Sequence, residues 1–179
     1  MPVLINNLQW MAWNVFLAII PIPFCYLTVK YGRQFISSIF FVFWILFFPN
    51  TIYLITDIEY LPHQLSRTVI SYDTLLILEY LILVGLGVIT YLWALKPISS
   101  KFKTPQYIVY IFNFGVAFAV ALGKIQRTES WQVITNPIRV INDVGKSLSN
   151  GQIILFVILF GILINFIWIL GTMRHDSHS

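Results

Sequence analysis

The chain has 179 residues, of which 58% are hydrophobic, 17% are aromatic and only 10% are charged, and its mean hydropathy is +0.81. These values lie far outside the range of soluble globular proteins and predict an integral membrane protein. The net charge of +4 does not indicate nucleic-acid binding, because the basic residues lie in short loops between apolar runs, where the topology bias of membrane proteins accounts for them.

Five apolar runs follow one another along the chain, at residues 8–29, 35–58, 72–95, 106–122 and 152–170. The runs contain 17 to 24 residues, within the range of about 17–25 helical residues that cross roughly 30 Å of hydrocarbon. Because these runs use most of the chain, we expect an all-α membrane helical bundle that forms a single domain over residues 1–179.

Prolines and glycines mark special places within the predicted spans. Pro21 and Pro23 lie inside the first span, where we expect them to kink the helix. Gly85 and Gly87 in the third span favour close packing against a neighbouring helix. No lysine or arginine precedes the first span and no small-residue cleavage site follows it, so we interpret it as a retained span and not as a signal peptide.

The long connection between the fourth and fifth spans has a pattern of its own. Asn136 followed by Pro137 is typical of a helix start, with an amide cap and a proline in the first turn. Beyond this point, apolar and polar residues fall on opposite sides of a helix. We therefore predict a short amphipathic helix over residues 137–149 that lies flat at the membrane interface.

The distribution of basic residues predicts the orientation of the chain. With five spans, the amino terminus shares one side of the membrane with the connections that follow the second and fourth spans. This side carries five of the lysines and arginines, and the opposite side carries six. Since basic residues favour the cytoplasmic side, we expect the amino terminus and these two connections to lie outside.

Residues 47–62, FFPNTIYLITDIEYLP, end a hydrophobic span with polar chemistry. On a continuous helix, one stripe would contain the polar residues spaced three or four apart, which are Asn50, Tyr53, Asp57 and Tyr60. Pro49, directly before the stripe, would bend the helix and turn the stripe toward the bundle centre. Because polar groups in hydrocarbon are costly unless they have partners, the stripe predicts the wall of a polar pocket.

Polar residues of the other spans are predicted at the same side of the membrane. Glu79, in the third span, is the most costly of them, and we expect either a protonated acid bonded to a neighbouring helix or part of a proton or cation relay. The ligand-binding residues that we predict are Asn14, Asn50, Tyr53, Asp57, Tyr72, Asp73, Lys124, Arg127, Ser130 and Trp131.

Four stretches resemble the motifs of a known family. They are AWNVFLAIIP at residues 12–21, FFPNTIYLITDIEYL at 47–61, SYDTLLIL at 71–78 and GKIQRTESWQVITNP at 123–137. In order and spacing they are similar to those of the bacterial membrane proteins of the domain of unknown function 1361 family. The resemblance implies a multi-pass protein of the bacterial cell (inner) membrane, and it brings no established reaction. Lys124 stands where this family often has arginine, and Glu129 where a small or amide residue is common.

Plainer structural roles stay open for the charged residues. Asp73 could interact favourably with the positive end of the helix that it begins. Asp57 lies near the carboxyl end of its predicted helix, where a negative charge is disfavoured, so a purely structural ion pair with Arg127 is an alternative. A metal site of Asp57 and Asp73 with His63 or Glu129 has no ligand spacing to support it, and neither a metal nor a cofactor is predicted.

Three functions of different classes fit this pattern. In the preferred one, the protein binds or transports a small polar molecule or a lipid headgroup, with Lys124 and Arg127 for an anionic group and Asp57 and Asp73 for amines, hydroxyls or a cation. In the second, it is a membrane-embedded hydrolase or transferase that acts on a lipid-linked substrate at the outer leaflet, with catalytic candidates Asp57 or Asp73 as general base and Arg127 stabilising negative charge. In the third, it assembles with a membrane-protein partner. The expected partners are membrane lipids, and no nucleic acid.

Overall fold

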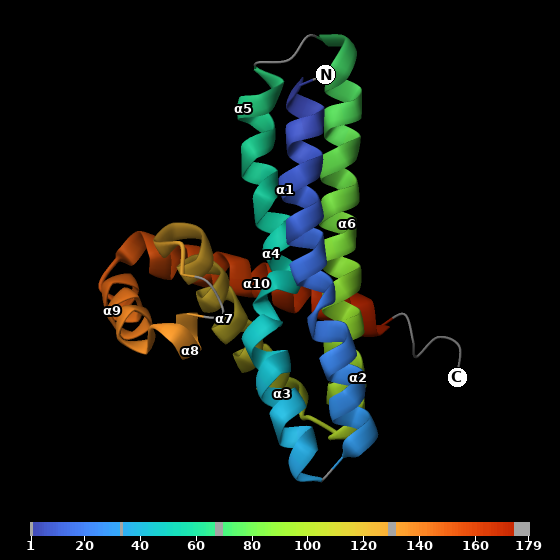
Figure 1. The fold of residues 1–179 in the computed structure, drawn as a ribbon, viewed down its shortest axis with the longest axis vertical. Helices are drawn as coiled ribbons and strands as arrows, with labels where there is room; N and C mark the ends of the chain where they lie inside the picture. Colours follow the sequence, from blue (N-terminus) through green and yellow to red (C-terminus); the bar gives the residue numbers. More distant parts are fainter. Residues whose placement is uncertain (1, 33, 67–69, 129–131, 174–179) are drawn as a thin grey trace. The chain divides into compact units, whose positions relative to one another are not determined.

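The computed structural model describes residues 2–32, 34–66, 70–128 and 132–173, and all regular structure in these ranges is helical (Figure 1). Five segments in them are long and apolar enough to cross a membrane, and these are Asn7–Tyr31, Phe35–Leu65, Tyr72–Lys101, Gln106–Gln126 and Gly151–Met173. The prediction of an all-α fold with five apolar helices is therefore confirmed.

The chain forms two compact units, Met1–Pro97 and Ile98–Ser179. The first unit contains α1 (Pro2–Ile19), α2 (Pro21–Tyr31), α3 (Phe35–Phe47), α4 (Pro49–Thr56), the 3-10 turn η1 (Asp57–Tyr60), α5 (Leu61–Leu65) and most of α6 (Ile70–Lys101). The second contains α7 (Gln106–Ala121), the π-helical turn η2 (Leu122–Gln126), α8 (Gln132–Thr135), α9 (Pro137–Leu148) and α10 (Gly151–Met173). The expectation of a single domain stays a prediction.

Prolines divide the first two spans into segments. Pro21 begins α2 and Pro49 begins α4, while the residues before them, Ile20 and Phe48, keep right-handed helical backbone angles. A proline in the first turn of a helical segment is tolerated, because the amide hydrogen that it lacks has no partner there. Each span therefore continues past its proline as a new helical segment.

The second and third spans extend beyond their predicted ends. The helical path does not stop at residue 58 but continues through η1 and α5 to Leu65, because Pro62 occupies the first turn of α5, where it does not break a helix. Likewise α6 runs to Lys101 with Pro97 inside it. The described part of the connection between these spans is thus helical up to Leu65, where the sequence pattern predicted a loop from residue 58.

The core of the first unit joins α1, α4 and α6, which run side by side (Figure 1). Its buried residues are Met11, Ala18, Leu54, Leu76, Tyr80 and Leu83. A Cβ on Gly87 of α6 would lie 3.1 Å from Cβ of Leu54 and 3.2 Å from the carbonyl oxygen of Thr51, so this glycine allows the close approach of α6 to α4. Gly85 has no such neighbour.

In the second unit, α7 and α10 pack against each other through polar and small residues. Within the pair, Asn113 donates to Oδ1 of Asn165 over 2.8 Å and Trp168 donates to Oε1 of Gln106 over 2.9 Å. A Cβ on Gly161 would overlap the ring of Phe114. Buried amides in apolar helices need partners, and these contacts supply them.

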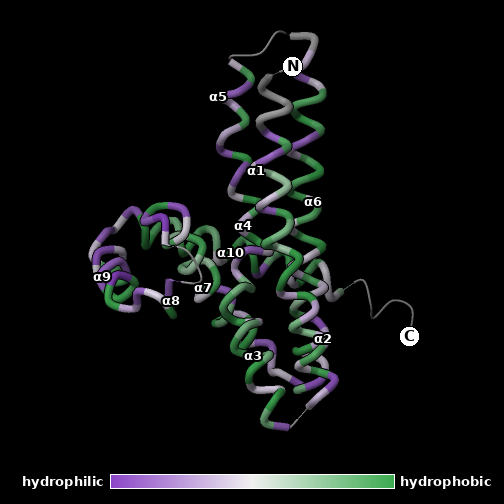
Figure 2. The backbone as a smooth tube through the Cα atoms, viewed as in Figure 1, coloured by the Kyte–Doolittle hydropathy of each residue, from purple (hydrophilic) through white to green (hydrophobic). Residues whose placement is uncertain are grey.

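The amphipathic helix α9 combines hydrophilic and hydrophobic residues (Figure 2). Ile138, Ile141 and Leu148 are exposed, whereas Asp143 and Ser147 are buried. The side chain of Asn136 accepts a hydrogen bond from the amide of Arg139, as the predicted cap should. Exposed apolar residues next to polar ones suit a helix at a membrane interface.

Candidate functional site

A pocket of about 310 Å³ lies between α1 and the α4–η1–α5 path in the first unit. The residues that line it are Trp10, Asn14, Tyr53, Asp57, Tyr60 and Gln64. Trp10 and Asn14 come from α1 and lie four residues apart. The other four lining residues follow one another at spacings of three or four residues along the α4–η1–α5 path. Both sets therefore form stripes on one helix face, and the two stripes face each other across the pocket.

Asp57 supplies the negative charge of this pocket. Its side chain is only 1% exposed, and Nδ2 of Asn14 donates a hydrogen bond to its Oδ2 over 3.0 Å. A buried carboxylate is tolerated only with such partners. Asp57 caps the carboxyl end of α4 and begins η1, and the helical path continues beyond it through α5 to Leu65.

A pair of amides fixes α1 to α5 beside the pocket. Nδ2 of Asn7 donates to Oε1 of Gln64 over 2.6 Å, and Nε2 of Gln64 donates back to Oδ1 of Asn7 over 2.9 Å. The same Oδ1 accepts from Nε1 of Trp10 over 3.2 Å. The side chain of Asn7 is also hydrogen-bonded to Glu79 of α6. Asn7 thus holds two of the pocket residues, Trp10 and Gln64, in place.

Two buried polar atoms next to this network lack hydrogen-bond partners among the described residues. They are Oε2 of Glu79 and the hydroxyl of Tyr80. Tyr80 is fully buried, and its ring centroid lies 6.4 Å from that of Trp10. Most buried polar atoms in proteins are paired, so these two atoms of α6 are unusual. They place a carboxyl oxygen and a hydroxyl group next to the hydrogen bonds of Asn7. Whether Glu79 is a protonated acid bonded to a neighbouring helix or part of a proton or cation relay stays a prediction.

The structure brings together three of the predicted site residues, which are Asn14, Tyr53 and Asp57. Asn50 is half-buried on α4 and does not line the pocket. Tyr72 and Asp73 lie in the first turn of α6, and they too are absent from the lining. For Asp73 this position is the one that suits a carboxylate at the positive end of a helix.

Sequence reasoning missed three members of the site. Trp10 was not among the predicted residues, Tyr60 belonged to the stripe but not to the predicted site, and Gln64 lay beyond the predicted end of the helix. Gln64 follows Tyr60 by four residues, so a longer helix would have extended the stripe to it. Asn7 and Trp10 share one face of α1 with Asn14, and that spacing is the signal that could have found them.

The other predicted residues belong to the second unit. Lys124 lies in η2, and Arg127 ends this turn with left-handed backbone angles, φ 53° and ψ 39°. Such a conformation costs about 1 kcal/mol or more in a residue other than glycine. Ser130, Trp131 and Glu129 lie outside the described residues. Whether Lys124 and Arg127 meet Asp57, as a ligand site or as an ion pair, stays a prediction.

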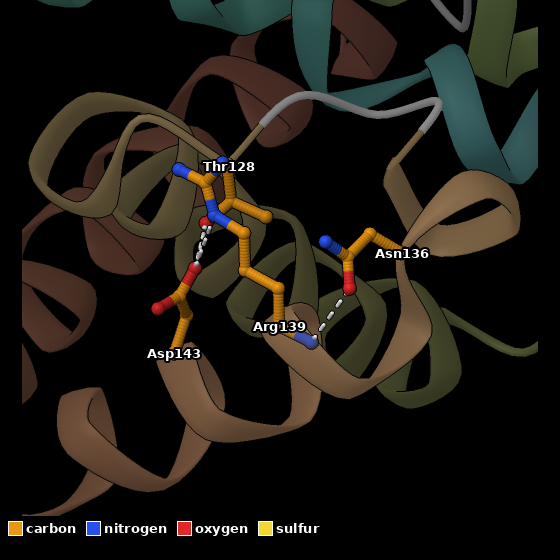
Figure 3. Close-up of polar contacts among 4 residues, drawn as sticks. All are labelled: Thr128, Asn136, Arg139 and Asp143. Carbon is orange, nitrogen blue, oxygen red and sulfur yellow. Dashed lines mark hydrogen bonds and ion pairs between the residues drawn. The ribbon is translucent and has the colours of Figure 1, made fainter.

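Close to Arg127, a polar cluster ties α9 to the end of η2 (Figure 3). Oγ1 of Thr128 donates to Oδ2 of Asp143 over 2.9 Å, and Nε of Arg139 lies 3.7 Å from the same oxygen. Asp143 is 7% exposed. These contacts explain why the polar edge of α9 faces the unit while its apolar residues stay exposed.

Among the residues that the structure describes, no group of three or more His, Cys, Asp or Glu side chains is placed to hold a metal ion. The residues that line the pocket provide one carboxyl group, two amides and three aromatic side chains.

Comparison with known proteins identifies one family. The family described as "Protein of unknown function (DUF1361)" matches residues 13–167, which include most of the pocket residues. No curated protein and no solved structure matches the chain significantly.

Proposed function

The chain belongs to the DUF1361 family, and we propose that it is a multi-pass membrane protein that binds a small polar molecule or a lipid headgroup in the pocket between α1 and α4–α5. The charge distribution of the connections favours the extracytoplasmic side of a bacterial cell membrane for this pocket. Binding could serve either reception or transport of the ligand.

The observation that supports binding most directly is a buried carboxylate that lines a pocket in an otherwise apolar protein. Charged and amide groups within membrane spans are costly and usually mark a functional site. Ligand pockets have volumes of about 300–1,000 Å³ and combine apolar walls with a few polar groups. The pocket of about 310 Å³, with Asp57, Asn14 and Gln64 among aromatic rings, has this composition.

The lining favours binding over catalysis. General acid–base catalysis uses positioned side chains that transfer a proton, most often histidine and also carboxylates and lysine. Among the described residues of the lining, Asp57 is the acidic one and no histidine or lysine is present, since the others are amides, tyrosines and a tryptophan. A carboxylate held by an amide is suited to recognising a donor or a positive charge.

The proposal can be tested by the thermal stability of purified protein against a panel of lipid headgroups, divalent cations and small polar metabolites. A ligand at 100 times its dissociation constant stabilises the folded state by about 2.7 kcal/mol. The informative variant is Asp57→Asn, which keeps the shape of the side chain and removes its charge. Glu59→Gln is the matched control, because Glu59 lies two residues away and is exposed.

We expect at least one ligand to raise the melting temperature of the wild type and of Glu59→Gln, with a much smaller effect on Asp57→Asn. If no ligand changes the wild type and Asp57→Asn strongly lowers its stability without any ligand, the pocket is a structural feature. A role in assembly with another membrane protein would then be the better explanation.

A further inference from the structure

We propose that the ligand of this pocket carries a positively charged ammonium group, which is bound by the carboxylate of Asp57 and the aromatic rings of Trp10, Tyr53 and Tyr60. This inference rests on the proposed function, since it concerns the chemistry of the ligand in the same pocket. It goes further because it assigns a charge and a group to that ligand.

The charge of the pocket walls favours a cationic ligand. Of the described residues that line the pocket, Asp57 is acidic and none is basic. Its carboxylate is 1% exposed, so water screens it weakly and its field acts strongly on a group inside the pocket. An anionic ligand would be repelled here, whereas a cationic one would be attracted.

Aromatic rings make up a large part of the pocket walls. Half of the lining residues are aromatic, one from α1 and two from the opposite helical path. The ring centroids of Trp10 and Tyr60 lie 6.1 Å apart with their planes at 71°, so the two rings provide walls in different directions. Electron-rich ring faces attract cations, tryptophan most strongly, and such sets of rings recognise quaternary ammonium groups.

Hydrogen bonds hold residues of the pocket in position before any ligand binds. Trp10 donates its indole hydrogen to Asn7, and Asn7 is paired with Gln64 through two hydrogen bonds. These bonds fix the orientation of the indole through Asn7 and join α1 to α5, which carry residues of the two walls of the pocket. A ligand then loses less free energy to ordering of the site when it binds.

The size of the pocket limits the ligand to a small group. A volume of about 310 Å³ is at the lower end for ligand pockets, so it suits a choline- or ethanolamine-sized group. Such a group can come from the headgroup of a lipid or from a free amine in solution. The shared feature is the ammonium group, and the experiment must separate the two sources.

The test compares choline with 3,3-dimethylbutan-1-ol, which has the same shape but a neutral carbon in place of the nitrogen. Binding would be measured by isothermal titration to the full chain, purified in a maltoside detergent that has no amine. We expect the neutral compound to bind at least about tenfold more weakly, because it loses both the ion pair and the attraction to the rings.

Variants at Asp57 and at Trp10 test whether choline binds in this pocket. Asp57→Asn should weaken choline binding by about tenfold or more, and Glu59→Gln should leave it unchanged. At Trp10, Trp10→Leu should weaken it by about tenfold, whereas Trp10→Phe, which loses the same hydrogen bond but keeps a ring, should weaken it less. Melting temperatures without ligand show which variants fold. If Asp57→Asn does not fold, the comparison of Trp10→Leu with Trp10→Phe still tests the inference.

Choline binding measured in nanodiscs distinguishes the two sources of the ammonium group. If the ligand is a lipid headgroup, phosphatidylethanolamine or phosphatidylcholine in the bilayer will compete with choline and lower its apparent affinity relative to phosphatidylglycerol alone. If the ligand is a free amine, these bilayers will give the same choline affinity. Both results support an ammonium ligand.

Other results would overturn the inference. Equal binding of choline and its neutral analogue, or choline binding that Trp10→Leu and Asp57→Asn leave unchanged, would show that this pocket does not recognise the charge. If inorganic phosphate or glycerol binds in an Asp57-dependent way and choline does not, the proposed function stands and the ammonium assignment fails. If no probe binds at all, both fail.

Discussion

The paired amides of Asn7 and Gln64 hold α1 against α5, and their removal should loosen the pocket by a predictable amount. Two hydrogen bonds, of 2.6 and 2.9 Å, join these side chains. A hydrogen bond contributes about 0.5–1.5 kcal/mol net, and between membrane helices the average is about 0.6 kcal/mol. The coupling energy of the pair should therefore be about 1–2 kcal/mol.

The single variants are expected to lower the free energy of unfolding by different amounts. Asn7→Ala also removes the acceptor of the Trp10 indole and the hydrogen bond of Glu79, so it should lower the free energy of unfolding by about 2–4 kcal/mol. Gln64→Ala loses only the amide pair among these bonds, and about 1–2 kcal/mol is expected. Gln9→Ala, at an exposed amide on the same helix, should change stability by less than about 0.5 kcal/mol.

These values can be measured by unfolding in increasing mole fraction of sodium dodecyl sulfate, followed by circular dichroism. The double variant of Asn7 and Gln64 should be more stable than the sum of the single effects predicts, by the coupling energy. If the two effects add to within about 0.3–0.5 kcal/mol, the two amides do not interact and the reasoning on how the pocket walls are joined is wrong.

Two further predictions concern the α7–α10 pair of the second unit, and both can be checked by the same unfolding measurement. Gly161→Ala should destabilise by about 1–3 kcal/mol, because the added methyl group overlaps the ring of Phe114 and the packed helices must shift. Gly115→Ala is the matched control, because nothing lies within 4 Å of the Cβ position of Gly115. Its free energy of unfolding should stay equal or rise by up to about 1 kcal/mol. An equal loss of stability at both glycines would contradict the tight packing of Gly161 against Phe114. Asn165→Leu removes the acceptor of the fully buried Asn113 amide and should cost about 1–2 kcal/mol, whereas an unchanged stability would show that this bond contributes nothing.

Local patterns in the sequence predicted those features that depend on neighbouring residues. The five apolar helices follow from run length alone, and the cap at Asn136 follows from its place before Pro137. The stripe through Tyr53 and Asp57 follows from helical spacing. Each of these needs only the geometry of one helix, which a sequence displays directly.

Features that depend on distant residues were harder to predict. Gln64 was missed because Pro62 and the polar residues before it are typical of a loop, yet a proline in the first turn of α5 leaves the helix intact. Asn7 gains its role only from the approach of α1 to α5, a contact across 57 positions of the chain. The Asn113–Asn165 bond similarly joins two spans, although an amide in each of two apolar runs is a signal that they could pair.

The most direct measurement of the central claim is native mass spectrometry of the protein purified from its membrane, with wild type, Asp57→Asn and Glu59→Gln compared under the same conditions. A small molecule or lipid bound in the pocket should appear as an added mass on the wild type and on Glu59→Gln, and it should be absent or much reduced on Asp57→Asn. The same added masses on all three proteins, or none on any of them even after incubation with amine-bearing lipids, would contradict a ligand held by Asp57.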